Sequence, residues 1–173
     1  IKMKKIIIQY NELISTEYLN DNSHIYINID QENKIEISKR LDLIKLDFFE
    51  MNIKYSKVNK IESLAKYAVN SVGEQKCVIS LNPMQFKINK LFDMKLINHE
   101  KLDLSQLDDE FTEPVYNNKI NFGEVGIQIF SSFLDPYPKI NNEDINLNRI
   151  YNNDDDSKLN KKNPFEVLNN INK

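Results

Sequence analysis

The fold of this chain is indicated best by residues 121–139, which read Asn-Phe-Gly-Glu-Val-Gly-Ile-Gln-Ile-Phe-Ser-Ser-Phe-Leu-Asp-Pro-Tyr-Pro-Lys. The side-chain oxygen of Asn121 can cap a helix, and Glu124 can return a bond to the N–H of the cap, as in a capping box. Asp135 stands before Pro136, which disfavours a helical backbone, so we expect the helix to end there. Apolar residues at helical spacing give this helix a wide face that must be covered: Phe122, Val125, Gly126, Ile129, Phe130, Phe133 and Leu134.

Much of the preceding sequence predicts strands with one solvent-exposed (wet) face and one buried face. Apolar and polar side chains alternate in residues 24–30, 49–55 and 86–96, and the last alternation breaks only at Lys90 and Leu91. We expect a first strand over residues 3–9 and a long extended stretch over residues 63–81, with a bulge or turn at Gly73. A second helix is expected between residues 30 and 42, capped by Asp30, with a buried stripe of Ile37, Leu41 and Ile44.

These patterns predict an α+β fold with a twisted antiparallel sheet packed with two main helices. Antiparallel sheets commonly keep one wet face, which is why we expect this strand direction, and we leave open a barrel-like closure of the sheet. Residues 1–139 would form this domain. Residues 140–162 offer little that could pack, so 140–173 is expected to be a mobile polar tail with a short helix at about 164–172.

Composition excludes several classes of protein. The chain has 173 residues, of which 40% are hydrophobic and 28% charged, as is ordinary for one globular domain with a tail. Its single cysteine cannot form an internal disulfide, and no window approaches the length of a membrane-spanning helix, so we expect a cytoplasmic protein with no membrane partner. The net charge is −3, so RNA could be held only by a local basic patch or through another protein.

The residues that could support catalysis or metal binding have simpler interpretations. Cys77 has no recognisable base beside it and is expected to be a buried structural thiol. The pattern Gly123-x-x-Gly126 lacks the remaining residues of a phosphate-binding loop. A loop expected over 98–118 could bind a divalent cation if its carboxylates converged, although a solvated loop is the simpler reading: Asp103, Asp108, Asp109, Glu110 and Glu113. We therefore expect no enzyme activity, metal or cofactor.

Two apolar segments are candidates for binding a partner. The segment Asp135-Pro136-Tyr137-Pro138, followed by Lys139, holds Tyr137 extended between two prolines, which suits it to anchor a protein or stack on a base. The simpler interpretation, which we favour from the sequence, is a helix stop with Tyr137 packed on the sheet. Near the C-terminus, a capped helix that begins at Pro164 would present Phe165 and Leu168, and it must dock on its own domain or on a partner.

Basic residues form three clusters along the chain. Any one cluster is most simply a solvated face, but two that converge in space would make the best RNA-facing surface. The second cluster is retained as a binding candidate together with the segments above. The clusters are Lys2, Lys4 and Lys5; Lys39, Arg40 and Lys45; and Lys54, Lys57 and Lys60.

Three motifs, in this order, resemble the YceD family of large-subunit ribosomal RNA accumulation proteins, in the form found in alphaproteobacteria. They are Gln-Lys-Cys-Val-Ile-Ser-Leu-Asn-Pro at 75–83, the Gly-Glu helix with its Leu-Asp-Pro-Tyr-Pro-Lys ending at 122–139, and Asn-Pro-Phe-Glu-Val-Leu at 163–168. The resemblance implies a non-enzymatic factor of large ribosomal subunit biogenesis. Such a factor supports 23S rRNA accumulation by contacting large-subunit rRNA or an assembling ribosomal protein, and no DNA partner is expected. A stable component of a divergent ribosome and a metal-dependent rRNA nuclease that uses the acidic loop are the alternatives.

Overall fold

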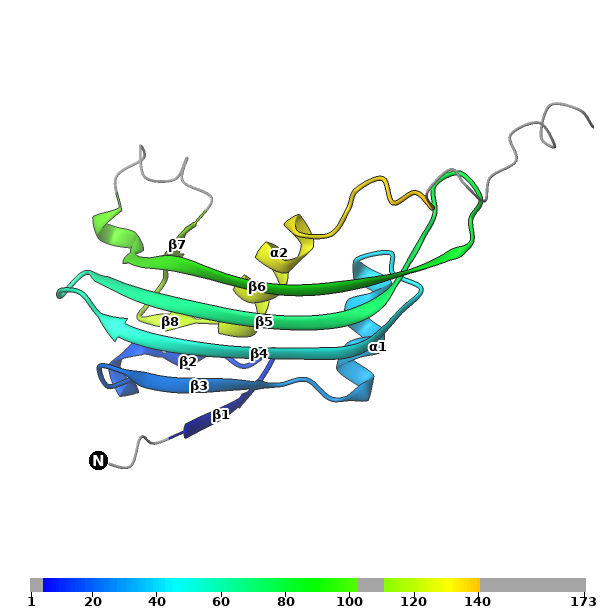
Figure 1. The fold of residues 1–173 in the computed structure, drawn as a ribbon. Coiled ribbons are helices and arrows are strands. Elements are labelled where there is room, and N and C mark those ends of the chain that lie inside the picture. The colour runs from blue at the N-terminus through cyan, green and yellow to red at the C-terminus, as the bar shows by residue number, and fades with distance from the viewer. Residues whose placement is uncertain (1–4, 103–110, 141–173) are drawn as a thin grey trace, which may run out of the picture. The chain divides into compact units, whose positions relative to one another are not determined.

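The computed structural model describes residues 5–102 and 111–140. The chain divides into two units, Ile1–Lys139 and Ile140–Lys173, and all of the described helices and strands belong to the first. These elements are drawn in Figure 1: β1 Lys5–Gln9, β2 Ile14–Ser15, η1 Thr16–Tyr18, β3 Ser23–Asn28, α1 Gln31–Arg40, β4 Lys45–Lys57, β5 Glu62–Lys76, β6 Pro83–Asn98, η2 His99–Lys101, β7 Thr112–Val115, β8 Lys119–Ile120 and α2 Phe122–Ser132.

The main sheet is open and mixed. Its six strands lie in the order β1-β3-β4-β5-β6-β7, and β2 pairs with β8 in a separate small sheet. The central pairs are antiparallel, whereas β1 runs parallel to β3 and β7 runs parallel to β6. The α+β class with two main helices is confirmed. A purely antiparallel sheet is wrong, and so is the barrel-like closure, because alternation along a strand reveals its wet face but neither its direction nor its neighbour.

Both main helices begin at the caps expected from the sequence. The side chain of Asp30 accepts from the Asn33 N–H at 2.8 Å, and the side chain of Asn121 accepts from the Glu124 N–H at 2.9 Å. The buried stripe expected for the first helix is wrong at its end, where Ile44 is 42% exposed and Leu43 is buried instead. The helix ends at Arg40 and the chain turns through a left-handed residue, so helical spacing no longer applies there.

The hydrophobic core lies between α2 and the inner face of the sheet. Phe49, Met51, Ile53 and Tyr55 on β4 are all buried, as their alternation predicts. The ring of Phe130 on α2 lies edge-on to that of Phe49, with centroids 4.7 Å apart. The buried Tyr67 hydroxyl donates to the Phe122 carbonyl at 3.1 Å, which ties the start of α2 to β5.

Three local expectations along the strands need adjustment. The extended stretch expected over residues 63–81 ends with β5 at Lys76, because the chain turns at residues 78–80 before β6 begins. The bulge expected at Gly73 lies opposite it on β4, where the register shifts between Leu46 and Phe48. Gly73 has a role of its own, since a Cβ there would lie 2.8 Å from the Phe86 ring. The loop expected over 98–118 contains η2 and β7, so it is not a simple loop. Pro114 lies within β7, an edge strand, where a missing N–H is tolerated.

Candidate nucleic-acid interface

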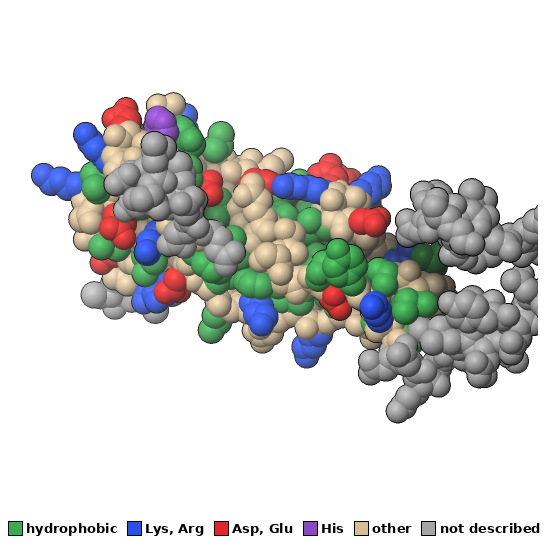
Figure 2. Space-filling model, turned by 90° about the horizontal axis from the view of Figure 1, so that it is seen from above, with side chains coloured by type: hydrophobic (Ala, Val, Ile, Leu, Met, Phe, Trp, Pro, Cys, Tyr) green, Lys and Arg blue, Asp and Glu red, His purple; other side chains and the backbone are tan. Residues whose placement is uncertain are grey.

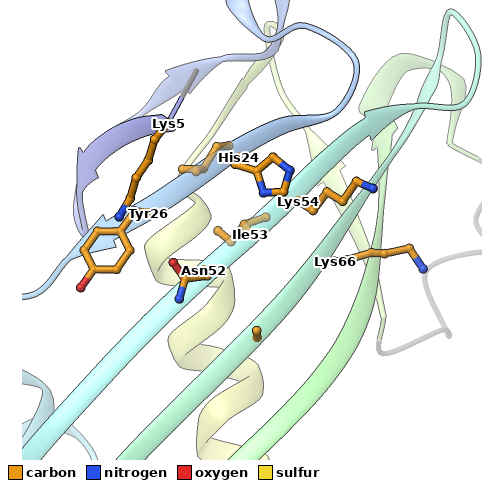
Figure 3. A pocket seen from close by; sticks show the side chains of 9 residues that line it. Lys5, His24, Tyr26, Asn52, Ile53, Lys54 and Lys66 are labelled. Carbon is orange, nitrogen blue, oxygen red and sulfur yellow. The ribbon is translucent and has the colours of Figure 1, made fainter. Parts of the chain in front are cut away.

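The candidate site lies on the face of the sheet opposite α2. In Figure 3 the side chains that line it stand in front of the strands, and α2 runs behind them. Within 5–102 and 111–140, no helix covers this outer face, because α1 and α2 both pack into the single core on the other side. Side chains from four neighbouring strands, β1, β3, β4 and β5, therefore meet on an accessible surface.

The first feature of this face is a row of basic side chains that crosses the strands, which we call the lysine row. Lys5 aligns with His24, His24 with Lys54, Lys54 with Lys66, and Lys66 with Asp93. Asp93 accepts from the Lys66 amine at 2.7 Å and so neutralises one lysine of the row. Neither Lys5 nor Lys54 forms an ion pair with any described residue. The row thus carries a local positive charge.

A second row lies beside it, and we call it the Tyr26 row. It is displaced from the lysine row by two residues on every strand, toward higher numbers on β1, β3 and β5 and toward lower numbers on the antiparallel β4 and β6. It consists of Ile7, Tyr26, Asn52, Ala68 and Leu91. The side chain of Leu91 is 78% exposed and that of Ile7 is 64% exposed, although both are apolar. The Lys5 amine lies over the Tyr26 ring, 4.2 Å from its centroid, and connects the two rows. Part of both rows borders a hollow of about 430 Å³.

Such an arrangement suits a polyanion that also carries aromatic rings. Lysines neutralise phosphates, and exposed aromatic and apolar side chains offer a surface on which bases stack. The acidic side chains on this face include Asp93, which is already paired, and Glu50 and Glu62, which lie four residues from the lysine row along β4 and β5. On the side of the molecule seen from above in Figure 2, acidic and basic side chains are interspersed with hydrophobic ones between them, so neither sign of charge dominates that side.

The structure brings together parts of two basic clusters named from the sequence. Lys5 comes from the first cluster and Lys54 from the third, and β3 alone separates their strands. Lys57 and Lys60 instead border a different hollow at the turn between β4 and β5. Sequence reasoning missed His24, Tyr26, Asn52 and Lys66, and their only signal was that each occupies a wet-face position of an alternating strand.

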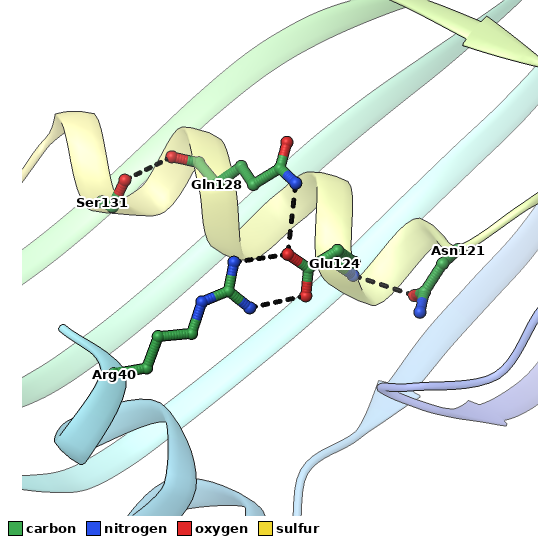
Figure 4. A network of polar contacts seen from close by, with 5 residues as sticks. All are labelled: Arg40, Asn121, Glu124, Gln128 and Ser131. Atoms are coloured by element: carbon green, nitrogen blue, oxygen red, sulfur yellow. Dashed lines mark hydrogen bonds and ion pairs between the residues drawn. The ribbon is translucent and has the colours of Figure 1, made fainter.

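The second basic cluster lies elsewhere. Lys45 forms ion pairs with Asp47 at 3.1 Å and Glu74 at 3.2 Å, and Lys39 is exposed on α1. Arg40 donates to the Glu124 carboxylate from both terminal guanidinium nitrogens, one of them at 2.7 Å (Figure 4). Acidic side chains within the protein therefore already neutralise the charges of Arg40 and Lys45.

Glu124 departs from the capping box expected from the sequence. Its N–H donates to Asn121, but its carboxylate accepts from Arg40 and from the Gln128 amide at 3.1 Å (Figure 4). The bond from Arg40 lowers the pKa of Glu124, and the same bond raises the pKa of Arg40. The pair joins α1 to α2, which a charge-assisted bidentate contact does with better-defined geometry than a single bond.

Replacing Arg40 by glutamine is expected to make the protein less stable by about 0.5–1 kcal/mol at neutral pH, the range of partly exposed ion pairs. Because the folded-state pKa of Glu124 is lowered, this stability is present above the ordinary glutamate value of 4.5 and is lost as the pH falls through the lowered value. Urea unfolding of wild type and Arg40→Gln across pH 3–7 measures the difference. Lys39→Gln, the neighbouring exposed residue, is the control, and an Arg40 effect that does not shrink as the pH falls below 4.5 would contradict this assignment.

The segment after α2 is held against the turn between β5 and β6. The Pro138 carbonyl accepts from the Val78 N–H at 2.9 Å, and the Asp135 carbonyl accepts from the Gln75 side chain at 3.0 Å. Pro138 is buried, whereas Lys139, Pro136 and Tyr137 are exposed. The expectation that Tyr137 packs on the sheet is wrong, because its side chain is 70% exposed. Two of the three YceD-like motifs, 75–83 and 122–139, thus contact each other.

The remaining candidate residues carry no site among the residues described. Cys77 is buried, and its sulfur accepts from the Ser80 N–H at 3.5 Å. No group of three metal-ligating side chains comes together in the described ranges. Glu113 lies on β7, where burial raises its pKa. Several residues named from the sequence lie outside the described residues: Lys2, Lys4, Asp103, Asp108, Asp109, Glu110, Pro164, Phe165 and Leu168.

Comparison of the chain with models of protein families, with curated proteins and with solved structures found no match. No helix in the described part of the chain has the length and apolar character needed to cross a membrane. The resemblance to YceD proteins therefore rests on the three sequence motifs.

Proposed function

We propose that this protein is a cytoplasmic, non-enzymatic factor of large ribosomal subunit biogenesis that binds large-subunit rRNA and supports its accumulation. One observation carries the RNA-binding part: the lysine row lies beside the Tyr26 row on an accessible sheet face. Charge alone would suit many anions, but phosphate and base contacts side by side are typical of proteins that bind nucleic acid. The YceD-like motifs support ribosomal RNA as the target.

The charge on this face favours a factor that leaves its target over a permanent ribosomal component. Two lysines of the row form no ion pair with a described residue, and the whole chain is acidic. On single strands each neutralised phosphate contributes about 0.7 to the salt dependence of binding, so two contribute about 1.4, a modest value. A surface with so few phosphate contacts binds RNA weakly and releases it readily. The nuclease alternative needs Asp108, Asp109 and Glu110, which lie outside the described residues, and no observation favours it.

Density-gradient separation of a native lysate, at low and high salt, tests the proposal. We expect the protein in fractions with precursor large subunits at low salt, absent from mature particles and released at high salt. A strain that carries Lys5→Gln with Lys54→Gln should lose most of this association, whereas Lys119→Gln, an exposed lysine on β8, should keep it.

Each of three outcomes would contradict a different part of the proposal. Equal presence in mature particles would identify a ribosomal component. Association that survives digestion of the RNA would identify a ribosomal protein as the partner. Normal levels of large-subunit rRNA in a strain without the protein would exclude a role in rRNA accumulation.

A further inference from the structure

We infer that the outer sheet face binds RNA as a single strand, with phosphates along the lysine row and bases on the Tyr26 row. This inference rests on the proposed function, since it names the form of RNA that the same surface accepts. It also assigns separate tasks to the two rows.

The spacing of the rows fits a nucleotide chain laid across the strands. Positions in the two rows are two residues apart along each strand, which corresponds to about 6.6 Å. Lys5 and Lys54 are separated by β3, two strand spacings or about 10 Å. The sheet can therefore contact a phosphate with one row and the base attached to it with the other, at more than one point along the strand.

The side chains of the Tyr26 row can stack against bases only if those bases are unpaired. In an RNA duplex the bases are stacked on each other and the deep major groove is closed to side chains, so proteins bind it by shape and backbone contacts. The exposed side chains of Ile7 and Leu91 and the ring of Tyr26 would then meet sugar and phosphate, where apolar surface gains little. A single strand can turn its bases onto these side chains, as aromatic sheet surfaces in RNA-binding proteins require.

The contact between Lys5 and Tyr26 suggests how the two rows act together. The Lys5 amine lies over the ring that a base would cover, 4.2 Å from its centroid. A phosphate at the lysine row attracts this amine away from the ring, because a full negative charge outweighs the weak attraction of a partly exposed ring. The ring face is then free for a base. Phosphate binding and base stacking therefore favour each other at this position.

The test measures binding of the purified full-length chain to a short fluorescent single-stranded RNA of mixed sequence, and to a duplex of the same sequence, by fluorescence anisotropy. We expect the single strand to bind more tightly. Tyr26→Ala should weaken that binding about fivefold or more, the loss of one stacked base, whereas Tyr26→Phe keeps the ring and should bind as wild type. Tyr18→Ala, which removes a tyrosine that is 84% exposed on η1, should have no effect.

Salt dependence separates the lysine row from the Tyr26 row. Lys54→Gln should lower the slope of log affinity against log salt by about 0.7, whereas Tyr26→Ala should leave the slope unchanged. Lys119→Gln, matched in charge but on β8, should leave both slope and affinity unchanged. The Tyr26 and Lys54 side chains lie on the outer face, and circular dichroism confirms that each variant is folded before binding is measured.

The results overturn this inference if the duplex binds as tightly as the single strand, or if Tyr26→Ala and Tyr18→Ala behave alike. Failure here is distinguishable from failure of the proposed function. Precursor-subunit association that persists although single-stranded RNA is not bound at this face overturns the inference alone. Binding as expected, with no association with precursor subunits in the gradient, overturns the proposed function and supports the inference.

Discussion

Gly123→Ala is expected to lower the free energy of unfolding by about 3 kcal/mol, the upper part of the range for inserting an atom into a packed interior. A Cβ at this position would collide with the backbone carbonyl of Tyr10 and lie 2.7 Å from the Tyr10 Cα. Backbone cannot rotate away as a side chain can, so either α2 or the chain after β1 must move. The loss exceeds the helix propensity that alanine gains over glycine, which is about 1 kcal/mol.

Urea or thermal unfolding followed by circular dichroism measures this effect, and Gly126→Ala in the same helix is the matched control. A Cβ at Gly126 would meet the side chain of Met51, which is flexible and can adjust, so a smaller loss is expected. Equal losses in the two variants, or a Gly123→Ala protein as stable as wild type, would contradict the backbone collision. A confirmed difference would also give a physical reason for glycine before glutamate in the YceD-like motif.

Phe130→Ala is expected to cost about 3–5 kcal/mol of stability, the range for removing a large buried aromatic side chain. Phe130 is fully buried and packs edge-on against Phe49, with Phe86 nearby at a centroid distance of 6.5 Å. Its removal leaves a cavity between α2 and the sheet, and a sheet of paired strands collapses poorly into such a space. For a protein with an unfolding free energy of about 5–15 kcal/mol, this is a large fraction of the total stability.

Phe48→Ala provides the control on the other side of the sheet. Phe48 is adjacent to Phe49 in the chain, but its side chain is 47% exposed, so we expect a loss below about 1 kcal/mol. Both variants are compared with wild type by urea unfolding at neutral pH. Comparable losses at positions 48 and 130 would show that the core does not lie on the α2 side of the sheet, as the structure has it.

Features that depend on residues close together in the chain were predictable. The caps at Asp30 and Asn121 use bonds that span three residues, so their patterns are visible in the sequence. The alternation predicted for β4 from Phe49 to Tyr55 is confirmed, because the side-chain period of a strand is a local property. Ile44 was mispredicted because the chain turns at Asp42 and the helical period ends.

Features that depend on distant residues could not be predicted in the same way. Glu124 binds Arg40 across 84 residues of sequence, in place of a bond back to its own cap. The strand β7 exists through its parallel pairing with β6, and its Pro114 and acidic neighbours resemble a loop. The sequence predicted a binding surface wherever two basic clusters met, but nothing local shows that Lys5 and Lys54 stand on strands separated by β3.

The sequence by itself determined the helix caps, the solvent-facing and buried faces of β3, β4 and β6 and the α+β class, because each follows from backbone bonds and periods within a few residues. Only the tertiary structure decided the open mixed sheet, the partner of Arg40 and the two rows on the outer face. The rows exist through the register of five strands, and a slip of one residue would turn a strand's contribution to the opposite face. That register is set by pairing and packing between segments far apart in the chain.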